Sequence, residues 1–427
     1  MFWFDFHWQI QHVLNQLWWP INLLLLVVVV SLGYLSYKKP AYAVGLTIIM
    51  LPTYLFRSKV WFLPFTFLEI CIWVIFLGWI ITKFVKKDFS FNYPKKYRYP
   101  ILLVLLAATI SLVISPDLKS AAGLWKAYFI EPILFFLVLI DTLKTKKDKK
   151  IILWSLGILS LPIALLAIYQ KFTGFAIFEP GWTSPDHRRV TSIFSSPNAI
   201  GLCLGPIIMI YLGWLIQEIK KLGPTILKIF ILILALLAII FSSSQGTILG
   251  LMAGTIFLMF FGWNKKYTSL LVIICLILIM LVPITRQKIW PVITLQDASG
   301  QNRIQLAQTA GNYLTQNSKN FVLGLGLLGF DKIQDQTRDP LKIEDLLYPH
   351  NIVLNFWVEL GLLGLLAFTW LIVIFFKQVK NKIKNSPDWL TLGIAACIIA
   401  LLVHGLVDVP YFKNDLAVLF WIIIGLI

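Results

Sequence analysis

Long apolar stretches separated by short polar segments dominate the chain. The apolar stretches fall at roughly 20–36, 41–56, 62–82, 100–115, 121–141, 151–170, 197–217, 226–241, 245–263, 268–285, 351–376, 389–407 and 414–427. Most of them approach the ~20 residues that a helix needs to cross a hydrocarbon core of ~30 Å. The pattern therefore predicts about 12 or 13 membrane spans, of which 41–56 and 100–115 are short.

The composition agrees with a membrane protein. The 427 residues are 59% hydrophobic and 13% charged, whereas a soluble domain is closer to half apolar and a quarter charged. Residues 1–20 are rich in Trp and Phe but lack a cationic start and a small-residue cleavage site, so we expect an interfacial helix and not a signal peptide. The predicted fold class is an all-α, polytopic transmembrane helix bundle.

The placement of positive charge predicts the orientation. More than half of the 37 lysines and arginines lie in short segments at 38–39, 83–98, 144–150, 220–228, 265–266 and 377–384. Short basic loops face the cytoplasm, so two longer polar segments, 173–196 and 286–349, are expected outside, the second as one large external loop. The net charge of +17 therefore reflects topology; no basic stripe interleaved with aromatics predicts nucleic-acid binding.

Cysteine and histidine spacing argues against metal chemistry. Each of the four cysteines lies in an apolar run, and the five histidines form no His-x-x-x-His pair. We therefore expect no disulfide, no tightly bound transition metal and no cofactor. The acidic residues of segment 286–349 have no spacing that indicates ligands of a divalent cation.

The segment 348–364 holds a histidine directly before an apolar run. Pro349 suits the first turn of a helix, so His350 and Asn351 are expected at the mouth of that helix, at the membrane edge. Histidine is the side chain best suited to move a proton near neutral pH. The alternative is that His350 is an interfacial capping residue.

Two arginines precede the helix start in the first outer segment. Arg188 and Arg189 come shortly before Ser196, Pro197 and Asn198, which are signals for a helix N-terminus. Arginine and a helix N-terminus together favour an anion. An arginine that only anchors the helix at the interface is the alternative.

The second outer segment contains Arg303 at the start of an amphipathic stretch. Its apolar positions Ile304, Leu306 and Ala307 could lie on the membrane surface, and Gly324, Gly326 and Gly329 interrupt the chain before His350.

Three further features lie within the spans. Gly246, Gly250 and Gly254 recur every four residues, which favours close helix packing. Glu131 and Glu359 are ionisable groups for which an ion pair and a role in the site are both open.

These motifs resemble those of a known family. Arg189-Val-Thr-Ser-Ile-Phe-Ser-Ser-Pro-Asn198, Ser242-Ser-Ser-Gln-Gly246 and Gly324-Leu-Gly326 are similar to segments of the O-antigen ligase and polymerase superfamily. So are His350-Asn351 followed nine residues later by Gly361-Leu-Leu-Gly364, and Val403-His-Gly-Leu-Val-Asp408. The resemblance covers about 185–427. It implies residues 1–185 as N-terminal transmembrane helices and 186–427 as a ligase-like domain that includes the external loop 286–349.

The resemblance implies a GT-C-type membrane glycosyltransferase of the bacterial cytoplasmic membrane with an outward-facing site. The reaction would be metal-independent and inverting, and it would serve surface polysaccharide or lipopolysaccharide assembly. The donor would be a glycan on undecaprenyl diphosphate, and the acceptor a lipid or glycan. His350 would be the catalytic base. Substrate contacts would come from Arg188, Arg189, Asn198, Gln245, Arg303 and Asn351, with Arg189 and Arg303 on the diphosphate.

The chain departs from the family at one position. Family members often carry an arginine where Gln245 stands. Either Arg188 or Arg189 then supplies the missing cation, or the donor is gripped less tightly.

Several functions remain open at this stage. A ligase, a repeat-unit polymerase and a protein oligosaccharyltransferase differ only in the acceptor, which the sequence does not show. A secondary transporter of a small anion is the alternative from another class. Transporters of that kind favour inverted repeats and charges at the bilayer midplane, whereas here the charges gather in the polar segments between the apolar runs.

Overall fold

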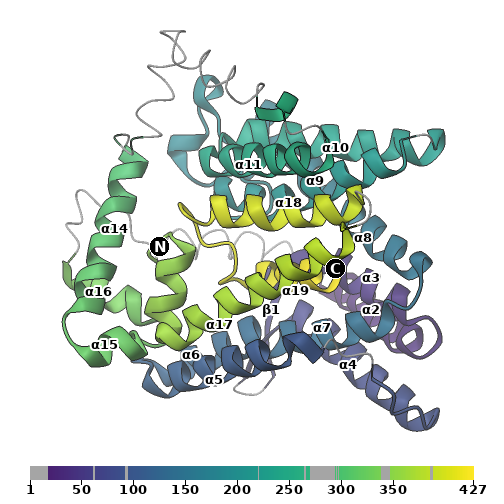
Figure 1. Ribbon diagram of the computed structural model, residues 1–427, viewed down its shortest axis with the longest axis horizontal. Coiled ribbons are helices and arrows are strands. Elements are labelled where there is room, and N and C mark those ends of the chain that lie inside the picture. Colours follow the sequence, from purple (N-terminus) through teal and green to yellow (C-terminus); the bar gives the residue numbers. More distant parts are fainter. Residues whose placement is uncertain are drawn as a thin grey trace. The chain divides into compact units, whose positions relative to one another are not determined.

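The computed structural model describes residues 18–60, 63–91, 95–219, 221–263, 266–269, 294, 296, 298–337, 347–384 and 388–427 (Figure 1). These residues are helices and their connections, apart from one two-stranded antiparallel hairpin. The all-α membrane bundle that the hydropathy pattern predicts is thus confirmed. The predicted span at 268–285 lies almost entirely outside the described residues.

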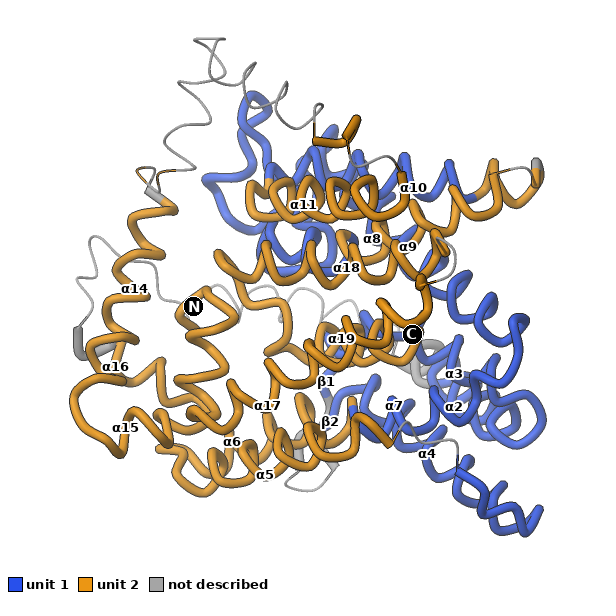
Figure 2. The backbone as a smooth tube through the Cα atoms, viewed as in Figure 1, with its two compact units in different colours: residues 1–93, 133–204, 228–243 blue, residues 94–132, 205–227, 244–427 orange. Residues whose placement is uncertain are grey.

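The chain forms two compact units, each built from separated stretches (Figure 2). Unit 1 comprises residues 1–93, 133–204 and 228–243, and unit 2 comprises residues 94–132, 205–227 and 244–427. The boundary predicted between residues 185 and 186 falls inside one stretch of unit 1 and stays a prediction.

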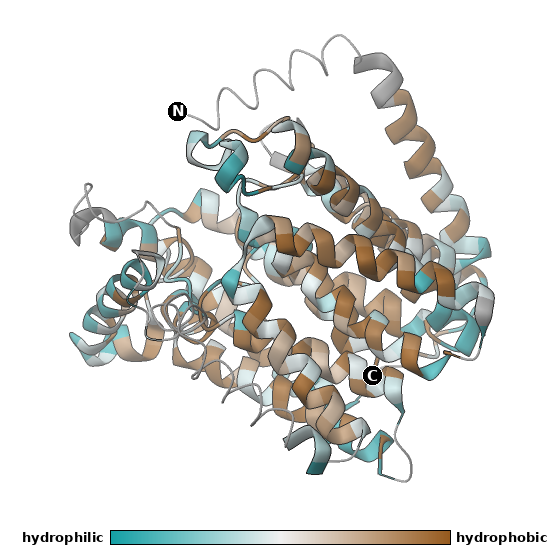
Figure 3. Ribbon diagram, turned by 90° about the horizontal axis from the view of Figure 1, so that it is seen from above, coloured by the Kyte–Doolittle hydropathy of each residue, from teal (hydrophilic) through white to brown (hydrophobic). Residues whose placement is uncertain are grey.

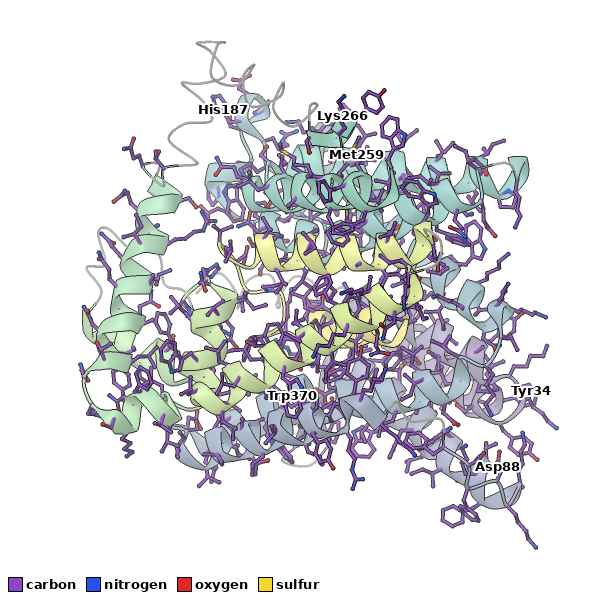
Figure 4. All side chains as sticks on the ribbon, in the orientation of Figure 1. Tyr34, Asp88, His187, Met259, Lys266 and Trp370 are labelled. Atoms are coloured by element: carbon purple, nitrogen blue, oxygen red, sulfur yellow. The ribbon has the colours of Figure 1, made fainter. Side chains whose placement is uncertain are left out.

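Unit 1 contains the N-terminal helices and the first outer segment. Its elements are α2 (Trp18–Lys38), α3 (Pro40–Ile49), η1 (Leu51–Leu55), β1 (Arg57–Val60), β2 (Leu63–Thr66), α4 (Phe67–Val85), most of α7 (Glu131–Thr142), α8 (Lys146–Thr173), η4 (Pro180–Trp182), η5 (Pro185–His187), the start of α9 (Pro197–Gln217) and most of α10 (Leu222–Ser242). Tyr34 on α2 and Asp88 after α4 lie at the surface of this unit (Figure 4).

Local capping decides where two of these helices begin. The Thr66 hydroxyl accepts from the Glu69 N–H, and the Glu69 carboxylate accepts from the Thr66 N–H. Thr145 and Asp148 form the same reciprocal pair at the start of α8. Such a capping box satisfies two backbone donors that the first turn leaves open. Helix α4 therefore begins at Phe67, and part of the predicted run from 62 is strand β2.

Unit 2 contains the C-terminal helices and the helical part of the second outer segment. Its elements are η2 (Lys95–Tyr97), α5 (Arg98–Ile114), α6 (Leu118–Trp125), the π-helical turn η3 (Lys126–Ile130), the rest of α7, α9 and α10, α11 (Gln245–Gly262), α14 (Ala298–Thr315), α15 (Ser318–Leu323), α16 (Gly329–Thr337), α17 (Ile352–Lys382), α18 (Trp389–His404) and α19 (Asn414–Gly425).

Glycines bring α11 and α18 close together, as the four-residue repeat predicts. A Cβ on Gly250 would lie 2.6 Å from the Ala400 carbonyl oxygen, and one on Gly254 would lie 2.8 Å from that of Ala396. The two helices lie side by side in Figure 1. Backbones approach this closely only where side chains are absent, so the packing role predicted for the repeat is confirmed.

One face of helix α14 packs against neighbouring helices. Leu306, Ala310 and Leu314 form one buried cluster with Phe330 of α16 and Val358 of α17. They recur every four residues, so one face of α14 is covered by α16 and the start of α17 (Figure 1). The expectation that Leu306 lies on the membrane is therefore wrong, because burial against neighbouring helices takes up the same apolar face.

The segment before α16 docks on a kink in α17. Gly361 interrupts α17 with φ +70° and ψ −178°. Its Cα faces the chain at residues 322–323, where a Cβ would lie 2.5 Å from the Val322 oxygen. Gly324, also at φ +70°, faces the carbonyls of α17 in return, and the Leu325 N–H donates to Val358 O at 2.7 Å. Gly324 and Gly361 together thus permit one backbone-to-backbone contact.

The described helices cover the predicted spans other than 268–285. Eight of them are long and apolar enough to cross a membrane. Four shorter apolar helices, Leu23–Lys38, Pro40–Ile49, Trp389–His404 and Asn414–Gly425, cover four more of the predicted runs. Hydrophobic residues dominate the helices, and hydrophilic residues gather at their ends and in the connections (Figure 3). The chain is therefore a multi-pass membrane protein.

The kink in α17 leads to a stability prediction. Gly361→Ala places a Cβ against Val322 O and forces a non-glycine residue to positive φ, so it should lower the free energy of unfolding by at least about 2 kcal/mol. Thermal unfolding of the purified protein in detergent measures this. The matched control is Gly311→Ala on α14, where a Cβ would meet open space; it should stabilise by up to about 1 kcal/mol. Equal midpoints for both variants would contradict the role of Gly361.

Candidate functional site

The start of α17 holds the turn that follows α18. Asn351 is the N-cap of α17, and its side-chain oxygen accepts from the N–H groups of Val353 and Leu354. Its side-chain nitrogen donates to Leu406 O at 3.0 Å, and the next N–H, of Ile352, donates to Gly405 O at 2.6 Å. The amide of Asn351 therefore joins two segments that are about 50 residues apart in sequence.

His350 and Asn351 lie at the helix mouth, as predicted, but Pro349 is not in the first turn. Helix α17 begins at Ile352 because Asn351 supplies the cap. His350 adopts φ +47°, which turns the chain sharply just before the cap. Positive φ in a residue with a Cβ is strained and persists only where its surroundings hold it.

The His350 imidazole faces a carboxylate on the docked turn. Its Nδ1 lies 3.3 Å from Asp408 Oδ1, and the side chains of His350 and Asp408 are 23% and 7% exposed. The Val409 N–H donates to the same carboxylate oxygen at 2.8 Å. A carboxylate beside Nδ1 favours the tautomer with its proton on that nitrogen, so Nε2 keeps a free lone pair. The pair has the geometry of a histidine base oriented by a buried acid.

The charge state of Asp408 follows from its neighbours. Burial alone would raise the pKa of this carboxyl group. The hydrogen bond and charge of His350, the charge of His404 and the N–H of Val409 outweigh burial and hold the pKa well below its usual range. Asp408 is therefore an anion at every pH above that range, and the stability it contributes is lost only as the pH falls through its lowered pKa.

Arg303 fixes the same turn from the other side. It is half-buried on α14, and its Nε donates to Val407 O at 2.8 Å, one residue before Asp408. Among the described residues, its terminal nitrogens have no hydrogen-bond acceptor. A guanidinium held by Nε and open at its ends is suited to bind an anion such as phosphate in two-point contact.

A second histidine approaches Asp408 from α18. His404 is 3% exposed, and its Nε2 lies 3.8 Å from Asp408 Oδ2. Gly246 of α11 faces the ring, since a Cβ there would lie 2.7 Å from His404 Cδ2. The cluster of His350, Asp408, His404 and Arg303 thus brings together three segments of unit 2: α14, the start of α17 and the end of α18 with the turn after it. In the described part of the chain, no group of three or more His, Cys, Asp or Glu side chains is arranged to hold a metal ion.

Gln245 is exposed at the first position of α11, directly before Gly246. Its amide is therefore accessible at the start of α11, next to the glycine that faces the His404 ring. The substrate role of Gln245 stays a prediction.

The predicted residues of the first outer segment belong to unit 1. Arg188 donates from Nε to Thr183 O and from Nη1 to Lys171 O, so its guanidinium ties the loop to the end of α8. Arg189 donates from Nε to Ser242 O at 3.1 Å and lies over the Trp182 ring. Asn198 lies in the first turn of α9, where its N–H donates to the Ser196 hydroxyl at 3.3 Å.

Two units thus hold the predicted site residues. Unit 2 contains His350, Asn351, Gln245 and Arg303. Of these, His350, Asn351 and Arg303 contact the turn after α18. Arg188, Arg189 and Asn198 belong to unit 1. The expectation that Arg189 and Arg303 bind one diphosphate stays a prediction.

The two acidic residues within spans have structural contacts. Glu359 is fully buried, and its Oε2 accepts from the Leu328 N–H at 2.8 Å. Ser111 also donates to the Glu359 carbonyl oxygen. Glu131 Oε1 lies 3.9 Å from Lys126 Nζ, which agrees with the ion pair that the sequence left open for this residue. Glu359 therefore holds the segment before α16 on α17.

Sequence reasoning named no role for Asp408 or His404. The signal was present as a His-x-x-x-Asp spacing, which places both side chains on one side of a helical end. In the sequence, the segment Val403–Asp408 carries only a resemblance, because nothing in the linear order connects it to His350.

Residues 230–369 match the family model described as O-antigen ligase. No curated protein matches the chain. The matched region contains Gln245, Arg303, His350, Asn351 and both glycines of the α17 contact, while Asp408 lies beyond it. This match confirms, over residues 230–369, the predicted resemblance to the O-antigen ligase and polymerase superfamily.

Proposed function

We propose that this protein transfers a glycan from undecaprenyl diphosphate to an acceptor hydroxyl on the outer side of the bacterial cytoplasmic membrane. The O-antigen ligase domain supports a membrane glycosyltransferase-like role in polysaccharide assembly. The observation that carries the proposal is the pairing of His350 with Asp408 on a turn that Arg303 also holds. A base and a cation are then placed at one helix mouth.

His350 is the proposed general base. An acceptor hydroxyl must lose its proton as it attacks, and a neutral imidazole with an open Nε2 accepts that proton near neutral pH. The imidazolium that forms is stabilised by the Asp408 carboxylate, which lies 3.3 Å from Nδ1. The side chain is partly exposed, so an acceptor can reach it, whereas a fully buried histidine would be closed to substrate.

Arg303 is the proposed partner of the leaving group. Breaking the glycosyl–phosphate bond leaves negative charge on the lipid diphosphate, and a preorganised cation at low dielectric stabilises that charge as it develops. The Nε contact to Val407 O fixes the guanidinium in advance, so little ordering is needed when the donor binds. Gln245 is proposed to add hydrogen bonds from its amide without adding charge.

The step balances as a single displacement. The acceptor oxygen forms a bond to the anomeric carbon, the carbon–oxygen bond to the diphosphate breaks, and the diphosphate leaves with the electron pair. The proton of the acceptor passes to His350. Direct attack on an α-linked donor inverts the anomeric centre. The acceptor is a lipid in a ligase and a second lipid-linked repeat in a polymerase, and both use the same proposed chemistry.

The first test removes the base and its partner. His350→Ala and Asp408→Asn should each lower transfer per folded molecule by roughly 10²- to 10⁴-fold, the usual worth of a general base and of a carboxylate that sets its tautomer. The assay uses purified protein with a lipid-diphosphate glycan and candidate acceptors.

The matched control is Asp117→Asn. Asp117 is an exposed N-cap of α6, and asparagine caps a helix equally well, so transfer should stay at the wild-type level. Near-wild-type turnover of folded His350→Ala would rule out the base role and leave only the structural role of His350 as a capping residue at the helix mouth.

The second test concerns the anion. Arg303→Ala should weaken donor binding at least tenfold, since a hydrogen bond to a charged group contributes about 1.5–3 kcal/mol. Arg303→Lys should recover only part, because the planar fork is lost. Binding is measured by titration of the donor. Arg98→Ala, at an exposed position in the first turn of α5, is the control and should leave donor affinity unchanged. Arg188→Ala should lower the folded yield, because its guanidinium holds two backbone carbonyls, and its donor affinity is measured in the same way. The same titration tests Arg189.

The third test concerns orientation. Single cysteines at Lys147 and Asp335 should be labelled by an impermeant thiol reagent from opposite sides, Lys147 from the cytoplasm and Asp335 from outside. The imbalance of lysine between the two sets of loops motivates this expectation. Labelling of position 335 from the cytoplasmic side would overturn the outward-facing site.

A further inference from the structure

His404 and Asp408 are two buried groups whose polar atoms face each other. His404 Nε2 and Asp408 Oδ2 are 3.8 Å apart, and neither has a hydrogen-bond partner among the described residues. The other oxygen of the same carboxylate faces His350. Buried polar atoms are nearly always paired, so two orphans that face each other point to a contact closed by a shift of less than about 1 Å.

Packing holds the His404 ring at this place. A Cβ on Gly246 would lie 2.7 Å from His404 Cδ2, 3.1 Å from Nε2 and 2.7 Å from Val407 Cγ2. The ring is thus confined between α11 and the turn that carries Asp408. The charged and titratable groups that act on it are Asp408, four residues on, and Arg303 of α14, with His350 on the far side of Asp408.

We propose that His404 is a positioning residue that acts through Asp408: its Nε2–H anchors Oδ2, so that Oδ1 is presented to Nδ1 of His350. A carboxylate anchored at one oxygen can still rotate about its Cβ–Cγ bond, whereas one anchored at both is fixed. His404 is 3% exposed and therefore does not contact the acceptor. The inference rests on the proposed function, since it deepens the role of the same base.

The proposal also gives Gly246 a function beyond helix packing. Gly250 and Gly254 contact the backbone and side chains of α18 along its length, whereas a Cβ on Gly246 would meet the edge of the imidazole itself. Only a residue without a Cβ leaves the ring where Nε2 faces Asp408.

The test compares variants with and without a hydrogen-bond donor in the side chain at position 404. His404→Phe keeps a flat ring and loses the N–H, so turnover at saturating donor should fall about 10- to 100-fold with little change in donor KM. His404→Gln keeps an N–H at a similar reach and should stay within about threefold of wild type. In the Asp408→Asn background, His404→Phe should cause no further loss, because residues that act through one another are not additive.

A second pair of variants separates position from packing. Gly246→Ala pushes on the ring without changing either partner chemically, and it should lower turnover per folded molecule. Gly254→Ala crowds the same helix face at Ala396 O and Met209; it should reduce thermal stability and leave turnover per folded molecule unchanged.

One readout does not need activity. The chain has five histidines, so ¹⁵N-histidine spectra of the purified protein can report the tautomer of His350. His404→Phe should reduce the population with the proton on Nδ1 of His350, and His404→Gln should preserve it. If wild type transfers no glycan, the proposed function fails while this measurement still decides the inference.

Three results would each overturn the inference: an unchanged His350 tautomer in His404→Phe, an equal loss of turnover in His404→Phe and His404→Gln, or additive losses with Asp408→Asn.

Discussion

The candidate site depends on the docking of the turn after α18 onto the start of α17. Two contacts between backbone and cap, Ile352 N–H to Gly405 O and Asn351 to Leu406 O, make the joint, and Arg303 adds a third contact at Val407. All three fall on consecutive residues just before Asp408. Without this joint, His350 and Asp408 would belong to separate helical ends, because they are 58 residues apart in sequence.

Close backbone packing without side chains supports the joint on both sides. Gly324 and Gly361 let the outer segment lie directly on the kink of α17. Gly246, Gly250 and Gly254 let α11 lie on α18. Between apolar helices in a membrane, association relies on van der Waals contact and hydrogen bonds. These glycine contacts support the packing in which His350, before α17, and His404, at the end of α18, both face the Asp408 carboxylate.

The polar groups of unit 2 divide by exposure and by partner. Glu359 is fully buried, and its carboxylate accepts a backbone N–H, so it serves the fold. His350 is partly exposed and paired with an anion, and Arg303 is half-buried with its terminal nitrogens open in the described part of the chain. A fully buried group that accepts a backbone N–H holds two segments together, whereas a charged group held on one side and open on the other can act on a substrate. This difference is why the chemistry is assigned to the helix mouth.

The sequence by itself determined the class of protein and most helix positions, because membrane helices follow from hydropathy alone. It also showed the resemblance that the family model supports over residues 230–369, because the motifs are local. It also placed His350 and Asn351 at the end of a helix, since capping is a property of neighbouring residues. Hydropathy misplaced the start of α4 and the face of Leu306, which a capping box and burial against α16 decide. Only the tertiary structure decided that Asp408 and His404 stand beside His350. No local rule links residues from two helical ends; that link arises from hydrogen bonds formed after the helices pack.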